Sequence, residues 1–588
     1  MSTLSRFIQG AAILLLIASG GCGRSGKTGH SLPANPLISK GAPGKPGGRF
    51  TIATPGFPKT FNPLFASDNV SDSIVRLMVG SLVNVDPANH EPGPGLAESW
   101  AVEPDQKTWT FKLRRGTRWS DGQPLTADDV VFTWNQVMYN PEFNRLTFDL
   151  FQIGGKRFEV SRTDDVTVRV VTPEVFAPLL EFFGTVPILP RHALENAVQA
   201  KVFPAAYGLK VPPDKIVGCG PYRLKEFQPG KFTLLERNPE YWVTDRTGRR
   251  LPYFDEIQFI PGSEPGSDAR MFLAGKSDAY DLVRPEFLEE FKQASQKARF
   301  DVLELGPGTE RDFLWFNQNT GTNSLGKPIV NPARLKWFRN KKFRQAFSCA
   351  MDRERMAREI YQGHARPIHG FLSSENPKWN NPNIPQFGYD PARARALLTE
   401  IGMQDRNGDG LLEDAEGNPL EIAFYSNADN SLRQRAALLI QDDLKKLGVK
   451  LNFVPIDFRS LVERINTSFD YECALMGLGG GGVDPASQLN VLKSSEELHQ
   501  WFPFQKAPST EWEARIDALM DTQMRTLDFA QRKKAFDEVQ TILGEEMPMI
   551  YTVSPFSYAA LRSGVGNTRP SVLTPYRVTW NLEELYFK

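Results

Sequence analysis

Residues 420–457 read LEIAFYSNADNSLRQRAALLIQDDLKKLGVKLNFVPID, and they hold the clearest secondary-structure pattern in the chain. At both ends of this stretch apolar residues alternate with polar ones, as in half-buried strands. The segment between them has the length and periodicity of a helix, with Ser431 as the expected N-cap and Gly448 as its end. Strand, helix and strand in this order predict a βαβ unit with parallel strands and a right-handed crossover. The sequence therefore predicts an α/β fold.

A further strand-like segment, YECALMGL at residues 471–478, runs directly into a glycine-rich loop, GGGGVDP. In open α/β sheets, ligands bind beyond the carboxyl ends of the strands. Glycines at that place let a ligand approach the backbone closely. We therefore expect a ligand-binding site here. The residues expected to line it are Gly477, Leu478, Gly479, Gly480, Gly481 and Asp484.

Two nucleotide-binding patterns occur in the chain, and neither has the structural context that it needs. Residues 477–482 satisfy the dinucleotide pattern G-x-G-x-x-G, but Pro485 follows and no tightly packed helix is expected after it. Residues 21–28 satisfy the phosphate-loop pattern G-x-x-x-x-G-K-[ST]. A phosphate loop must lead into a helix, and the prolines between residues 33 and 46 exclude one.

The first residues instead have the layout of a secretory signal. Arg6 precedes an apolar run that reaches Ser19, and small residues follow. The stretch ASGGC resembles the end of a bacterial lipoprotein signal, so we predict a signal peptide over residues 1–22 and lipidation at Cys22. Ser19 stands where such signals usually have leucine, so cleavage without a lipid stays open. Residues 23–46 are rich in Gly, Pro, Ser and Lys and predict a flexible tether.

The overall composition excludes several classes of function. The 588 residues include 69 basic and 69 acidic ones, so no excess charge draws the chain to nucleic acid or to anionic lipid. A chain of this length predicts two to four domains. Beyond Cys22 only Cys219, Cys349 and Cys473 remain; they form no disulfide framework, although one bridge is allowed.

Acidic residues cluster in two places, and each cluster has a structural explanation. Asp128 and Asp129 fall in the first turn of a helix that Thr126 caps, where the helix dipole stabilises negative charge. Residues 405–416, DRNGDGLLEDAE, fit the calcium-loop pattern throughout. A strand pattern follows this loop, so it is not a complete EF-hand, and an ordinary helix-to-strand turn is the alternative. The expected ligands of a structural calcium ion are Asp405, Asn407, Asp409, Leu411 and Glu416.

Several long stretches together resemble the extracytoplasmic solute-binding proteins of ABC importers, specifically the oligopeptide/dipeptide/nickel-binding family, family 5. The resemblance covers nearly the whole mature chain. It is carried by FNPLFASDNVSDSIVRLMVGSLV, WSDGQPLTADDVVFTW, ILPRH, VGCGPYRLKEFQPGKFTLLERNPEYW, KFRQAFSCAMDR and YDPARARALL. It implies a periplasmic-binding-protein-like fold of type II, with two lobes, hinge strands and an inserted extra domain.

The resemblance also implies domain limits. Lobe I is expected at residues 47–76, 185–312 and 557–588, and lobe II at residues 313–556. The extra domain is expected at residues 77–184. The ligand is expected to be enclosed between the two lobes as they close.

The resemblance points to further site residues and to one departure from the family pattern. In peptide binders of this family, an aromatic residue and an aspartate that pairs with the peptide amine stand where this chain has Leu478 and Gly481. An upstream arginine of some members is Leu475 here. Asp68 is an alternative amine anchor, or simply a loop cap. The other residues implied to face the cleft are Ala66, Ser67, Asn69, Trp315 and Asn317, with core packing as the alternative for Trp315.

The resulting expectation is a receptor and not an enzyme: an extracytoplasmic, lipid-anchored monomer that delivers a peptide-like solute to an ABC permease. It requires no cofactor and binds no nucleic acid. Two alternatives stay open. One is a secreted hydrolase that uses two carboxylates with perturbed pKa values. The other is a sensor or chaperone-like protein on the same scaffold.

Overall fold

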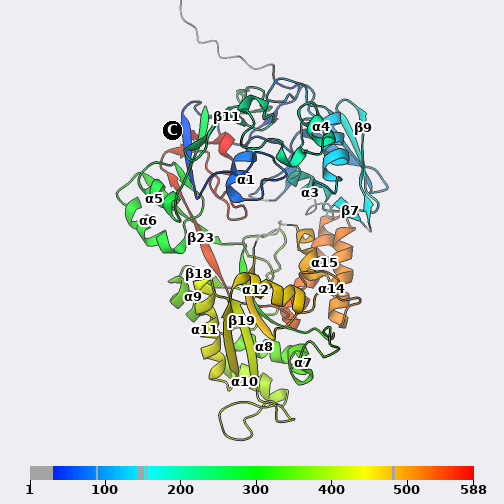
Figure 1. Ribbon diagram of the computed structural model, residues 1–588, viewed down its shortest axis with the longest axis vertical. Coiled ribbons are helices and arrows are strands. Elements are labelled where there is room, and N and C mark those ends of the chain that lie inside the picture. Colours follow the sequence, from blue (N-terminus) through cyan, green and yellow to red (C-terminus); the bar gives the residue numbers. More distant parts are fainter. Residues whose placement is uncertain (1–30, 88–89, 144–150, 154, 480–483) are drawn as a thin grey trace, which may run out of the picture.

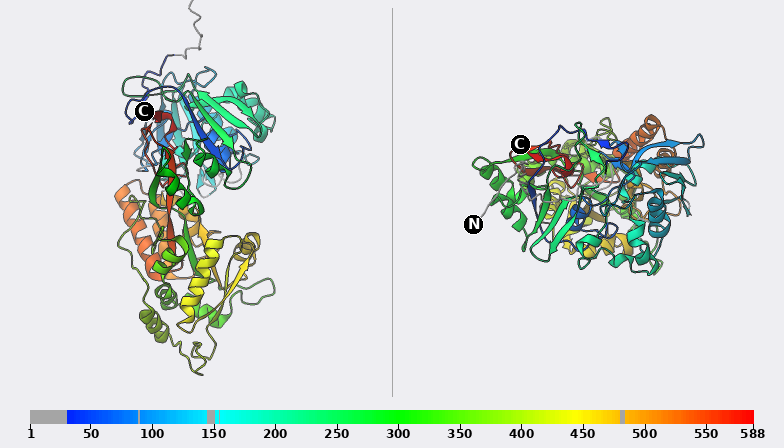
Figure 2. Two further views of the ribbon diagram at one scale, coloured as in Figure 1. Left: turned by 90° about the vertical axis from the view of Figure 1, so that its left-hand side faces the viewer. Right: turned by 90° about the horizontal axis from the view of Figure 1, so that it is seen from above.

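The computed structural model describes residues 31–87, 90–143, 151–153, 155–479 and 484–588. The chain forms two bodies stacked along the longest axis of the molecule (Figure 1), and the side view shows the same division (Figure 2). The C-terminus lies in the upper body.

Lobe I is the part of the upper body built on a large mixed sheet. Strand β2 is parallel to β14, with Arg49 opposite Glu256, and β23 is antiparallel to β16. Apolar side chains on one sheet face, such as Phe50 and Ile257, are fully buried in the core. In order, the strands are β11 (Tyr222–Gln228), β12 (Phe232–Arg237), β14 (Glu256–Pro261), β2 (Arg49–Thr54), β15 (Ala279–Tyr280), β23 (Val553–Arg562) and β16 (Phe300–Pro307). The helices include α1 (Asn69–Val75), α4 (Arg191–Gln199), α5 (Ser267–Leu273) and α6 (Leu288–Ser295).

The extra domain, also in the upper body, has its own antiparallel sheet of the order β5-β6-β10-β9. Its helix α2 (Ala127–Phe132) has the predicted capping box, in which the Asp129 carboxylate accepts from the Thr126 N–H at 2.9 Å. Asp129 is buried and also accepts from the Arg191 N–H, which confirms its structural interpretation. The other elements are β5 (Ala97–Val102), β6 (Thr108–Leu113), β9 (Glu159–Asp164), β10 (Thr167–Val171) and α3 (Leu179–Thr185).

Lobe II, the lower body, holds the βαβ unit that the sequence predicts. Strands β19 (Glu421–Asn427) and β20 (Lys450–Ile456) are parallel, and α11 (Ser431–Lys445) connects them. The predicted N-cap is wrong by one residue: Asn430 caps α11 by accepting from the Arg433 N–H. The sheet order is β20-β19-β21-β17-β22, with β21 at Cys473–Leu478, β17 at Arg311–Phe316 and β22 at Ile550–Tyr551.

Helices cover both faces of the lobe II sheet and bury two hydrophobic cores. Leu314 and Phe316 of β17 pack on one face, and Phe313 and Trp315 pack on the other. The helices on the first face include α8 (Lys341–Ala350), α10 (Pro391–Glu400) and α11, and those on the second include α12 (Phe458–Glu463), α14 (Glu511–Met524) and α15 (Phe529–Glu546).

The chain passes between the two lobes at two places. It enters lobe II through residues 308–310, between β16 and β17, and it returns at Thr552, between β22 and β23. Strand β18 (Ala365–Pro367) of lobe II also pairs with the start of β23. The first residues of β17 therefore lie directly beside the connections between the lobes.

The N-terminal segment corrects the predicted tether. Strand β1 (Leu37–Ile38) pairs with Val243–Thr244, and the Arg114 guanidinium donates to the Asn35 carbonyl at 2.6 Å. Residues 31–46 are thus packed on the upper body, because their backbone finds hydrogen-bond partners there. The predicted signal peptide, Cys22 and the rest of the tether lie outside the described residues.

Two further expectations can be compared with the structure. Cys219, Cys349 and Cys473 are buried free thiols, so the bridge that the sequence allowed does not form among them. Within the described residues, no helix combines the length and the apolar character that crossing a membrane requires.

Candidate functional site

The expected glycine-rich site begins at the carboxyl end of β21. A Cβ on Gly477 would lie 2.2 Å from the Asp312 Oδ1 atom and 2.8 Å from the Arg433 Nη2 atom. Those two atoms form an ion pair at 2.7 Å across the strand, so only glycine fits beneath it. Leu478 is half-buried and Gly479 is exposed. Gly480 and Gly481 lie outside the described residues.

Asp484 is close to this strand end, but its carboxylate is already neutralised. Both of its oxygens accept from the Arg532 guanidinium, at 2.7 and 2.8 Å, and both residues are buried. The same carboxylate also accepts from the Ala486 N–H and caps a short 3₁₀ helix at Pro485–Gln488. In this arrangement Asp484 stabilises lobe II and has no free oxygen for a ligand.

Asp68, the alternative amine anchor, is the N-cap of α1. Its carboxylate accepts from the backbone N–H groups of Val70 and Ser71 and from the Ser71 hydroxyl. Burial acts to raise the pKa of Asp68, but the hydrogen bonds from Ser71, the charge of Lys59 and the Val70 N–H together outweigh it, so the net pKa is lowered. Asp68 is therefore a capping residue, which was the alternative to its role as an amine anchor. Ala66 is half-buried beside it, and Ser67 and Asn69 are exposed.

Trp315 and Asn317 are interior residues of lobe II. Both side chains are fully buried. The Trp315 indole N–H donates to the Tyr471 hydroxyl at 3.1 Å, and the Asn317 amide donates to the carbonyls of Phe469 and Tyr471. Trp315 is therefore a core residue, as the alternative interpretation of its position predicted.

The predicted calcium loop folds on its own backbone. Asp405 accepts from the N–H groups of Gly408 and Gly410, and Asp409 accepts from that of Leu411. Asn407 accepts from the Asp409 N–H. Glu416, the expected bidentate ligand, is paired with Lys336 at 2.6 Å. No group of three or more His, Cys, Asp or Glu residues in the described part of the chain is arranged to hold a metal. Calcium binding stays a prediction.

A set of contacts between the extra domain and lobe II was not predictable from the sequence. The Ala177 N–H donates to the Met524 carbonyl at 2.8 Å, and Glu174 pairs with Arg525 at 2.9 Å. Lys378 of lobe II pairs with Glu91 at 3.0 Å. These residues lie far apart in the sequence and follow no motif, so only the tertiary structure brings them together.

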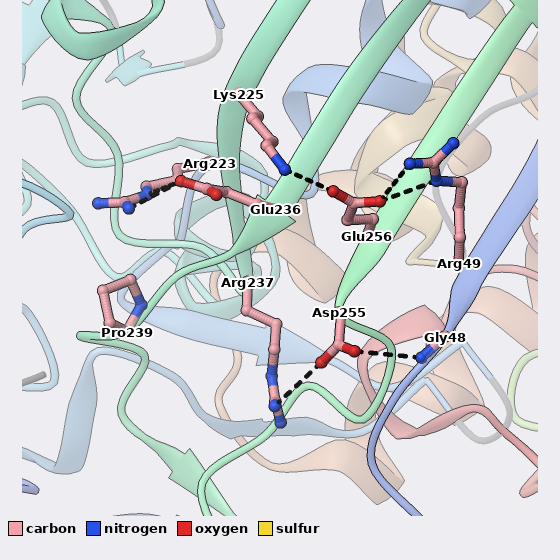
Figure 3. A pocket seen from close by; sticks show the side chains of 9 residues that line it. All are labelled: Gly48, Arg49, Arg223, Lys225, Glu236, Arg237, Pro239, Asp255 and Glu256. Atoms are coloured by element: carbon pink, nitrogen blue, oxygen red, sulfur yellow. Dashed lines mark hydrogen bonds and ion pairs between the residues drawn. The ribbon is translucent and has the colours of Figure 1, made fainter. Parts of the chain in front are cut away.

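A hollow of about 900 Å³ lies on the upper body, away from the strand ends of lobe II. Its floor is the solvent face of β11, β12, β14 and β2, opposite to the core face (Figure 3). Its charges are paired across the strands: Glu256 with both Arg49 and Lys225, and Glu236 with Arg223. Because these charges neutralise one another, we do not assign this hollow as the ligand site.

Comparison with known proteins places the chain in a family. Residues 91–499 match the middle region of the bacterial extracellular solute-binding proteins, family 5. A probable ABC transporter-binding protein of Deinococcus radiodurans is 29% identical over 549 residues, which cover 88% of this chain and 89% of that protein. The oligopeptide-binding protein AppA of Bacillus subtilis is 24% identical, with 93% of each chain covered.

Solved structures agree with this placement at the level of the fold. The structure of Bacillus subtilis AppA in complex with a nonapeptide matches with a TM-score of 0.66 at 23% identity, over 92% of this chain and 99% of that one. The binding protein MelB of Agrobacterium fabrum, in complex with stachyose, matches with a TM-score of 0.69 at 20% identity, over 95% and 88%.

The chain therefore belongs to the bacterial extracellular solute-binding proteins of family 5. It has the periplasmic-binding-protein-like α/β fold and is a solute-binding protein. Members of this family are solute-binding proteins rather than enzymes.

Proposed function

We propose that this receptor captures a peptide-like solute between its two lobes and delivers it to the membrane subunits of an ABC permease. The observation that carries the proposal is the architecture: two lobes joined by two chain passages, with the carboxyl end of β21 and the first residues of β17 beside those passages. Two such connections allow the lobes to close on a ligand as rigid bodies.

We further propose that the ligand has no free amine. Gly481 occupies the position where the resemblance implies an amine-binding aspartate. The two aspartates considered as substitutes are committed elsewhere, since Asp484 pairs with Arg532 and Asp68 caps α1. An ammonium group enclosed without a carboxylate would cost several kcal/mol, so a blocked or amine-free ligand fits better.

The remaining features of the proposal concern the state of the protein. We propose a monomer that Cys22 anchors to the outer face of a membrane through lipid. Several acyl chains, as bacterial lipoproteins carry, would make this anchoring stable. The receptor requires no cofactor, although a structural calcium ion at residues 405–416 remains part of the proposal.

A hydrolase is disfavoured as an alternative. Glu181 and Asp484 are acidic neighbours between the extra domain and lobe II, where the Glu181 carboxylate accepts from the Asp484 N–H at 3.0 Å. Arg532 binds both oxygens of Asp484, so this pair leaves no free Asp484 oxygen to face a substrate.

Thermal unfolding with pooled peptides of two to five residues tests the proposal. A ligand at a hundredfold excess over its Kd stabilises the native state by about 2.7 kcal/mol, which raises the melting temperature. We expect N-acetylated peptides to raise it at least as much as unmodified ones. A preference for free amines would contradict the amine-free ligand. If no peptide raises the melting temperature of folded, ligand-free protein, the peptide class is wrong.

A further inference from the structure

Arg311, the first residue of β17, is a buried cation without a counter-charge. Only 6% of the residue is exposed. Its guanidinium donates to the Gln488 side-chain oxygen at 3.1 Å and to the Thr309 carbonyl at 3.4 Å, both neutral acceptors. The Nε–H group has no partner, and no carboxylate of the described residues forms an ion pair with this side chain. Burial lowers the pKa of Arg311, as expected for an uncompensated charge.

Other buried arginines of lobe II have either a charge partner or a hydrogen-bond acceptor for each nitrogen of the guanidinium. Arg532 is paired with Asp484, and Arg344 is paired with Glu546. Arg353 has no ion pair among the described residues, but its three nitrogens donate to the Tyr551 carbonyl and to the carbonyl and hydroxyl of Ser348, at 2.7 to 2.9 Å. A buried guanidinium is normally satisfied in one of these two ways, because an unpaired one is costly.

Arg311 lies where the glycine-rich strand end and one of the connections between the lobes meet. It is the cross-strand partner of Leu478, the last residue of β21, so the two side chains share one face of the sheet. Residues 308–310, one of the two connections between the lobes, immediately precede it. The Phe371 ring lies 4.4 Å from the guanidinium carbon and fixes the plane of the group.

We propose that Arg311 is the counter-charge for a carboxylate carried by the ligand. A planar guanidinium forms strong, directional hydrogen bonds to a carboxylate. The Nε–H and the remaining Nη hydrogens supply the donors. The inference rests on the proposed function and adds to it that the solute carries a carboxylate. An N-blocked peptide acid fits both statements, whereas binding of an acidic oligosaccharide would keep the role of Arg311 and replace the peptide class.

Matched pairs of probes that differ only in a carboxylate test this inference. The first pair is an N-acetylated peptide pool with free C-terminal acids and the same pool with C-terminal amides. The second pair is a short oligogalacturonide and stachyose. Binding to the full chain is measured by isothermal titration and thermal unfolding. In whichever pair binds, we expect the acid to bind at least about tenfold more tightly than its neutral counterpart.

Variants separate the inference from the proposed function. Arg311→Met should abolish the preference for the acid while binding of the neutral probe stays measurable. The matched control, Arg515→Gln, removes an exposed arginine that is paired with Glu538 and should retain the preference. Without any ligand, Arg311→Met should raise the melting temperature, because an uncompensated buried charge is removed.

Each outcome tests either the role of Arg311 or the proposed class of solute. Tighter binding of the neutral probes, or a preference that survives in Arg311→Met, overturns the role of Arg311. A lower melting temperature of ligand-free Arg311→Met also overturns it, since that would make the arginine a structural group. If no probe binds the wild-type protein but Arg311→Met is more stable, the choice of solute is wrong and the unpaired charge remains supported.

Discussion

The carboxylate of Glu181 accepts a hydrogen bond from the backbone N–H of Asp484 at 3.0 Å, and this bond joins the extra domain to lobe II. In Figure 1, α3, which carries Glu181, lies above α15 and on the opposite side of the molecule from β23. The lobes are thus held together at a second place, distant from the strand connections. The lobe closure that we propose would therefore involve the extra domain as well as the two chain connections.

This contact predicts a pH dependence. Burial, and then repulsion from the Asp484 carboxylate, raise the pKa of Glu181 to about 7. A carboxyl group with a raised pKa favours the folded, closed form most at low pH, and this contribution is lost as the pH rises from about 4.5 to about 7. Glu181→Gln imitates the protonated form. We expect it to match the wild type near pH 5 and to melt about 2 °C or more higher at pH 8.

The control for this experiment is Glu174→Gln, which removes a half-exposed ion pair with Arg525 in the same interface. Exposed ion pairs contribute little, so this variant should follow the wild type at both pH values. A melting difference for Glu181→Gln that is the same at pH 5 and pH 8 would contradict the assignment.

The Asp484–Arg532 ion pair predicts a large loss of stability on substitution. Asp484→Asn leaves the buried guanidinium of Arg532 without its charge partner, which costs about 3 kcal/mol or more. Chemical unfolding measures the loss, and the double variant Asp484→Asn/Arg532→Met should recover part of it. Unchanged stability together with lost ligand binding would instead make Asp484 a ligand residue.

Asp68 predicts a smaller effect of a different kind. Asp68→Ala removes the cap of α1 and should cost about 1 kcal/mol, whereas Asp68→Asn keeps a capping oxygen and should cost little. Both variants should bind unmodified and N-acetylated peptides in the same ratio as the wild type. The amine-anchor hypothesis makes the opposite prediction, that Asp68→Asn selectively weakens binding of peptides with a free amine.

The hydrogen bonds of the buried Glu513 carboxylate predict that acid destabilises lobe II. Burial acts to raise its pKa, but hydrogen bonds from His499, Gln505, Thr510 and Trp501 lower it to about 2. A lowered pKa stabilises the fold above about pH 4.5, by about 3 kcal/mol, and this contribution is lost as the pH falls toward 2. In urea unfolding, Glu513→Gln should therefore be less stable at pH 7, and the gap should narrow at pH 3. A gap independent of pH would disprove the role of ionisation.

Local sequence patterns predicted the regular parts of this fold well. Alternation and helical periodicity placed β19, α11 and β20, because those patterns reflect a single buried face. The Thr126–Asp129 capping box was also predictable, since its partners are three residues apart. The N-cap of α11 differed by one residue because Asn430 and Ser431 are both good caps and only backbone geometry chooses between them.

The site was less predictable, because it depends on partners that are distant in the sequence. Asp484 reads as a free acid until Arg532, 48 positions later, is found against it. The composition of residues 31–46 suggests a linker, yet their backbone is held by Val243–Thr244. The isolation of Arg311 also has no sequence signal, since a missing partner is visible only in three dimensions.

The packing of residues 31–46 on the upper body limits how far the receptor can travel. From Cys22 to Ser31, a fully extended chain reaches only about 30 Å. If Cys22 is acylated, the upper body is held close to the lipid surface. Its rotation is then restricted, because the connection to the lipid leaves the upper body at Ser31. Such a receptor meets its permease by diffusing in two dimensions, and a solute released elsewhere must first reach the membrane.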